Sequence, residues 1–106
     1  MFIIFNKASI NFTNKEDVTL VLPSKININD LFYKIEHESF PEKITLFMDI
    51  LDGKEKLIQL TLNGSGIKED NLNSPGLFQS ESFEVEKIKL ICFRDIKLLF
   101  TLWKED

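Results

Sequence analysis

The stretch Ile44–Leu62, ITLFMDILDGKEKLIQLTL, has the clearest structural pattern in the chain. Apolar residues occupy alternate positions before Asp52-Gly53 and again after it, which is the period of strands that bury one face. An Asp-Gly pair between two such runs predicts a β-hairpin. A three-residue turn at 51–53 pairs Leu46 with Ile58 and leaves one face of the hairpin wholly apolar. We therefore expect this register, with a glycine bulge at Gly53.

A helix is expected just before this hairpin, at about 29–39. Asn29 is a good N-cap residue, and Asp30 suits the positive start of a helix dipole. With 100° between successive residues of a helix, one face forms a stripe of Leu31, Phe32, Ile35 and Ser39. Tyr33 and His37 lie on the opposite face. Pro41 ends the helix, because the residue before a proline avoids helical geometry.

Further strands are expected on both sides of these elements. The run 2–6 is a first strand, which 10–12 either continues or pairs with, and 18–22 is a second strand, closed by Pro23-Ser24. Together they predict an opening hairpin. Near the end, alternation along 83–92 changes parity at Lys87, which is typical of a bulge. After a turn at Arg94-Asp95, residues 96–102 form a last apolar face. Residues 63–81 lack a regular pattern and are expected to form a long irregular loop.

The sequence therefore predicts one α+β domain spanning residues 1–106. Its core is an antiparallel sheet of six to seven strands, an arrangement compatible with a sandwich, and one amphipathic helix packs on one face. With 106 residues, a hydrophobic fraction of 43% and a charged fraction of 28%, the chain can form a single buried core without a disulfide or a bound metal.

Composition excludes several kinds of site. The chain has one cysteine and one histidine, which exclude an internal disulfide and any metal site built from several Cys or His ligands. We expect no cofactor and no metal. No long apolar run or signal-peptide pattern is present, so we expect a cytoplasmic protein that does not enter a membrane. The net charge of −4 argues against a nucleic-acid partner.

No set of residues indicates catalysis. His37 is expected on the solvent side of the helix, and Cys92 shares the parity of buried neighbours, which suits a small core residue better than a nucleophile. Asp49 and Asp52 could act as paired carboxylates, but an outward strand residue and a residue that starts the turn explain them better. We therefore expect a protein that is not an enzyme.

The charge distribution is the one uneven feature. Residues 69–86 contain five carboxylates and no Lys or Arg: Glu69, Asp70, Glu81, Glu84 and Glu86. These charges could simply keep a sheet edge soluble. They could also form a docking surface for a basic protein, with Leu77 and Phe78, and in addition Trp103, as apolar anchors.

Two functional hypotheses follow from this charge. In the first, the protein is an immunity or inhibitor protein that blocks the basic site of a bacterial toxin, of which a nuclease is the best fit. In the second, it is an adaptor, a chaperone or a phage or secretion accessory module that binds other proteins or self-associates through a free strand edge. Both hypotheses rest on size, acidity and the absence of a catalytic pattern rather than on a specific motif.

Overall fold

The chain folds as a β-sandwich. The computed structural model describes residues 2–13, 16–37, 43–51, 55–62, 66–73 and 83–105. They form eight strands and one 3-10 turn: β1 (Phe2–Asn11), β2 (Asp17–Asn27), η1 (Ile28–Asp30), β3 (Leu31–His37), β4 (Ile44–Leu51), β5 (Glu55–Leu62), β6 (Gly66–Asn71), β7 (Glu84–Ile91) and β8 (Lys97–Glu105). No α-helix occurs among these residues, so the predicted α+β class is wrong and the fold is all-β.

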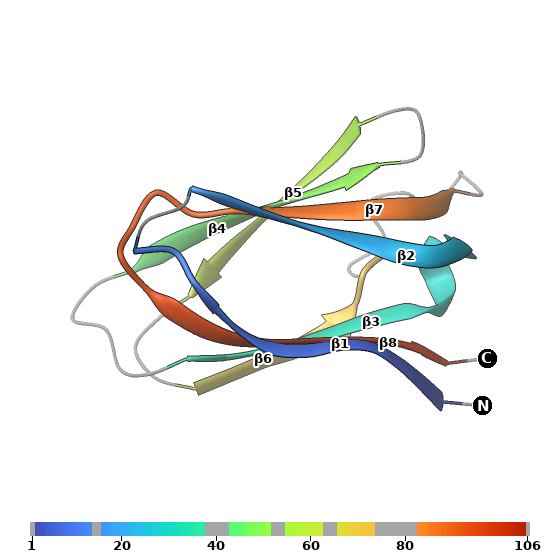
Figure 1. The fold of residues 1–106 in the computed structure, drawn as a ribbon, viewed down its shortest axis with the longest axis horizontal. Coiled ribbons are helices and arrows are strands. Elements are labelled where there is room, and N and C mark those ends of the chain that lie inside the picture. The colour runs from blue at the N-terminus through green and yellow to red at the C-terminus, as the bar shows by residue number, and fades with distance from the viewer. Residues whose placement is uncertain are drawn as a thin grey trace.

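Two antiparallel sheets of four strands face each other (Figure 1). We call them the first sheet, with the order β1-β8-β3-β6, and the second sheet, with the order β2-β7-β4-β5. Alternate side chains of both sheets point into one core, and its fully enclosed members include Ile35, Leu46, Met48, Ile88, Leu90 and Phe100. The hydrophobic effect along these two inner faces is the main force that joins the layers.

Of the predicted helix at 29–39, residues 29–37 are instead part of the turn η1 and the strand β3, and 38–39 lie outside the described residues. Leu31, Tyr33 and Ile35 are buried, whereas Phe32 and Lys34 between them are half-exposed, which is the two-residue period of a strand. β3 pairs with β8 on one side and with β6 on the other. These two ladders satisfy its backbone, and the β-branched and aromatic residues suit a strand better than a helix. The predicted helix places Tyr33 on the exposed side, and the burial of Tyr33 contradicts it.

The predicted opening hairpin is also wrong, because β1 and β2 lie in different sheets. β1 pairs with β8 and β2 with β7, so both partners come from the far end of the chain. Pro23 does not close β2 at residue 22. The register with β7 shifts between Val21 and Ile26, so Pro23 falls in a bulge where the ladder needs no N–H donor. The change of parity predicted near Lys87 is confirmed, since Val85 and Ile88 are both buried, but the extra residues of the bulge lie on β2 and not in 83–92.

Two further expectations need correction. β4 and β5 do form a hairpin with one apolar face, but Leu46 pairs with Leu60 and Met48 with Ile58, two residues from the predicted register. A shift of two keeps every side chain on its face, so the apolar pattern cannot distinguish the two registers. Part of the predicted loop at 63–81 is the strand β6, which completes the first sheet beside β3.

The apolar face predicted for 96–102 is confirmed, since Ile96, Leu98, Phe100 and Leu102 are all buried. β8 occupies an interior position of the first sheet, between β1 and β3. Among the residues described, no helix has the length and apolar character needed to cross a membrane.

Candidate functional site

The acidic residues predicted to bind a partner are divided between the two sheets. Glu69 and Asp70 lie on β6, at the edge of the first sheet, while Glu84 and Glu86 lie on β7, inside the second sheet. All four side chains are exposed. Leu77, Phe78 and Glu81 lie outside the described residues. The predicted single acidic surface is therefore at least two surfaces.

Glu69 and Asp70 also point to different sides of β6, because neighbouring residues of a strand alternate. Glu69 lies opposite Lys34, and Asp70 lies opposite the buried Tyr33. Burial, and secondly the negative charge of Asp70, raise the pKa of the Tyr33 hydroxyl to about 12. Glu69 thus belongs to the outer face of the first sheet, and Asp70 does not.

One corner of the sandwich connects the ends of the acidic segment. The backbone N–H of Leu72 donates to the Leu31 carbonyl at 2.9 Å, and that of Ile28 donates to the Phe83 carbonyl at 2.8 Å. The residues that precede and follow segment 74–82 are therefore both fixed to η1 and the start of β3. We call this part of the molecule the η1 corner.

Asparagine side chains tie the η1 corner together. Nδ2 of Asn71 donates to the carbonyls of Asn29 and Leu31, both at 2.9 Å, and its Oδ1 accepts from the N–H of Asn73 at 2.8 Å. Nδ2 of Asn73 donates to Oδ1 of Asn29 at 2.6 Å. Asn27 caps η1 through its side-chain oxygen, which accepts from the Asn29 N–H. Each of these bonds satisfies a backbone or amide group at a turn.

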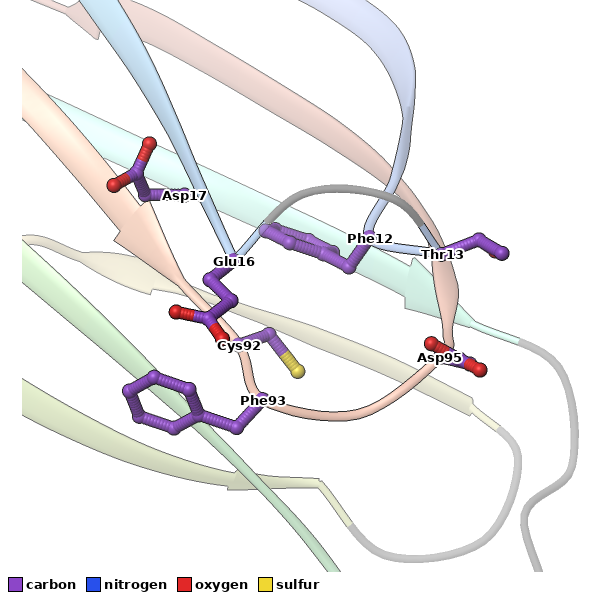
Figure 2. Close-up of a pocket in the computed structure, with 7 residues that line it drawn as sticks. All are labelled: Phe12, Thr13, Glu16, Asp17, Cys92, Phe93 and Asp95. Atoms are coloured by element: carbon purple, nitrogen blue, oxygen red, sulfur yellow. The ribbon is translucent and has the colours of Figure 1, made fainter.

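A pocket of about 710 Å³ lies at the end of the sandwich away from the η1 corner, where β2 begins and β7 ends (Figure 2). Its lining is Phe12, Thr13, Glu16, Asp17, Cys92, Phe93 and Asp95. The N–H of Cys92 donates to the Glu16 carbonyl at 2.9 Å, which fixes the chain just before β2 to the chain just after β7. Figure 2 shows the Glu16 carboxylate directed toward Cys92 and the Asp17 carboxylate directed away from it. Asp17 instead pairs with Lys89 at 3.6 Å.

The thiol in this pocket is held in its neutral form. Cys92 is 1% exposed, as its parity in the sequence predicts, and burial raises its pKa although Arg94 acts in the opposite direction. Beside it, Phe93 is 65% exposed and meets Phe47 edge-on with ring centroids 6.3 Å apart. The pocket therefore presents carboxylates and aromatic surface rather than an activated nucleophile.

The remaining candidate residues lie apart from this pocket. His37 is at the end of β3, next to Leu98 of β8, and not on a helix. Asp49 faces outward on β4 between Lys89 and Leu57, as expected for a strand residue, and Asp52 lies outside the described residues. Within the described part of the chain, no group of three or more Cys, His, Asp and Glu residues is placed to hold a metal ion.

The outer face of the first sheet carries an aromatic pair. Phe32 and Trp103 stack with centroids 5.9 Å apart and an angle of 17° between rings. They line a hollow of about 550 Å³ that also includes Lys34, Glu69 and Glu105. Trp103 is only 6% exposed although it faces outward, so it is covered by its neighbours and is not an exposed anchor for a partner.

Comparison with protein families, curated proteins and solved structures found no match to this chain.

The sequence reasoning missed the pocket of Figure 2. Arg94-Asp95 is predicted as a turn, but the sequence does not bring it close to Glu16 and Asp17, because these residues adjoin only once β2 pairs with β7 and β1 with β8. Phe93 was a usable signal. It follows the buried Cys92 out of the strand, so a large apolar residue at that place is expected to face solvent.

Proposed function

We propose that this protein is a non-catalytic binding protein that neutralises a basic protein partner, in the way that an immunity protein neutralises a toxin. One observation carries the proposal: Asp70, Glu84 and Glu86 are exposed, in a segment, 69–86, without Lys or Arg. Glu69 is left out because it belongs to the outer face of the first sheet. Lys34 and Lys89 form ion pairs with other carboxylates, those of Glu36 and Asp17. Exposed charge of one sign favours a partner of the opposite sign.

The η1 corner is the part of this surface that we assign to the partner. Asp70 is two residues before the Leu72–Leu31 hydrogen bond, and Glu84 directly follows Phe83, which bonds to Ile28. Both carboxylates thus adjoin a fixed turn, and a rigid base reduces the entropy lost on binding. Glu86 follows on the same strand. Leu77, Phe78 and Glu81 lie between these points in the sequence, and their role as anchors is proposed from the sequence alone.

A nuclease is the partner class that this charge fits best. Its active site binds phosphates with Lys and Arg side chains, and exposed carboxylates can occupy the same positions. Charges at the rim of such a contact speed association, and salt screens them. The proposal includes that the protein binds its partner in the cytoplasm, since a single buried free thiol suits a reducing compartment.

The test begins with tagged protein expressed in its native host. The principal captured protein is purified, its isoelectric point is determined, and its nuclease activity is titrated with this protein. We expect a basic partner whose activity is lost at one equivalent. The double variant Asp70→Lys with Glu84→Lys should weaken binding by roughly 100-fold at low salt, because two opposite-sign contacts become repulsive.

The matched control is Glu69→Lys with Glu105→Lys. It makes the same change in net charge with two exposed residues that line the hollow on the first sheet. We expect it to bind within a few-fold of the wild type. An acidic partner, or equal losses in the two double variants, would overturn the assignment to the η1 corner.

A further inference from the structure

The four edge strands of the sandwich differ in how well they resist pairing with another chain. β2 has the bulge at 22–25 with Pro23, β6 has three consecutive charged residues at 68–70, and β1 has a register shift next to Asn6. Bulges, prolines and charges are the usual means of protecting an edge. β5 has neither a bulge nor a proline: its register with β4 is continuous from Glu55 to Leu62, and its only charged residues are the first two, Glu55 and Lys56.

The surface of β5 suits a strand partner without charge. Its inward residues Ile58, Leu60 and Leu62 are buried, and its outward residues Gln59 and Thr61 are exposed. Leu57, also outward, is 58% exposed. Residues 57–62 include no charged side chain, in a chain of which 28% is charged. A charged strand placed beside this edge would lose solvation without gaining a counter-charge.

From this we infer that β5 pairs with β5 of a second copy, in antiparallel orientation, to form a two-fold dimer with one continuous sheet. A two-fold axis perpendicular to the sheet keeps each face continuous only if residues of equal parity lie opposite. Centring the axis on Gln59 places Gln59 opposite Gln59, Leu57 opposite Thr61 and Ile58 opposite Leu60. These pairs lie within the charge-free stretch, and the next pair places Leu62 opposite Lys56.

This register makes the strand complementary to itself. The amide side chains of the two Gln59 residues can each donate to the other, because opposite positions in an antiparallel pair are about 5 Å apart. On the inner side, Ile58 and Leu60 extend the two cores toward each other. The ladder satisfies the backbone groups on the side of β5 that has no strand neighbour among the described residues.

Variants of Gln59 test the register directly. Wild-type protein should sediment with a mass about twice 12.4 kDa. Gln59→Lys and Gln59→Glu should each be monomeric, with the dissociation constant raised roughly 100-fold or more, because like charges face each other at the axis. An equimolar mixture of the two should restore a dimer that contains one copy of each.

Ser9→Lys and Ser9→Glu are the controls. Ser9 is exposed and faces outward on β1, an edge strand of the other sheet, so both variants should stay dimeric. Circular dichroism and a thermal melt establish that each variant is folded. The inference is overturned by a wild type that stays monomeric up to roughly 1 mM, where even weak pairing is populated. Charged Gln59 variants that remain dimeric, or a mixture that stays monomeric, also overturn it.

The edge could instead take a strand of another protein. A monomeric wild type that loses a captured partner on Gln59→Lys would show this, and it too overturns the dimer. Binding of the basic partner is measured on the Gln59→Lys background, so failure of the dimer and failure of the η1 corner are read separately.

Discussion

Replacing Asn71 by alanine tests whether the η1 corner is held by hydrogen bonds. The side chain makes three bonds, to the carbonyls of Asn29 and Leu31 and from the N–H of Asn73. A hydrogen bond contributes about 1 kcal/mol net, and less where water can replace it. Asn71 is half-exposed, so we expect a loss of about 2 kcal/mol, or roughly 8 °C in Tm for a domain of this size.

Urea unfolding followed by tryptophan fluorescence measures this loss, with the m-value as a check on two-state behaviour. Asn6→Ala is the matched control. It removes one bond, from Nδ2 of Asn6 to the Phe100 carbonyl at 3.0 Å, and should cost about half as much. If Asn71→Ala costs no more than Asn6→Ala, the asparagine network does not hold the corner.

Three further results are expected. Tyr33, the only tyrosine, should ionise with a pKa of about 12 in the folded protein and about 10 in urea, so the free energy of unfolding should fall as the pH rises from about 10 to about 12. Ultraviolet absorbance measures the two pKa values, and equal values would contradict the burial of Tyr33. Cys92 should resist alkylation at neutral pH and react once urea unfolds the chain, whereas rapid labelling of native protein would refute an enclosed thiol. Ile35→Ala should cost about 2–5 kcal/mol and Lys34→Ala under about 1 kcal/mol, measured by urea unfolding; similar losses would argue against β3.

Strands with strict alternation could be predicted from the sequence, because a period of two leaves few alternatives. The runs at 44–51, 57–62 and 96–102 were assigned correctly for this reason. The segment 31–37 fits both periods, since Leu31 and Ile35 are separated by four residues. Only the contacts of Tyr33 with the core decide between them, and those depend on β6 and β8. Long-range pairing overrode a plausible local signal.

The prediction of the acidic surface failed for the same reason, because the strand pairing is not visible in the sequence. Glu69 and Asp70 are neighbours in the sequence, yet a strand directs them to opposite sides, whereas a loop would not have done so. The charge count alone could not separate Glu84 on the second sheet from Glu69 on the first. Once the topology is known, the acidic segment resolves into the η1 corner and the outer face of the first sheet.

The position of β8 has a consequence for biosynthesis. β1 emerges from the ribosome first and β8 after all the other strands, yet β8 lies between β1 and β3 in the finished sheet. Until it arrives, β1 and β3 lack the strand that pairs with the backbone edge of each, and a nascent chain with unpaired strand edges is a substrate for chaperones. Formation of the first sheet is therefore delayed until translation has passed residue 105, and we expect slow folding governed by this late insertion.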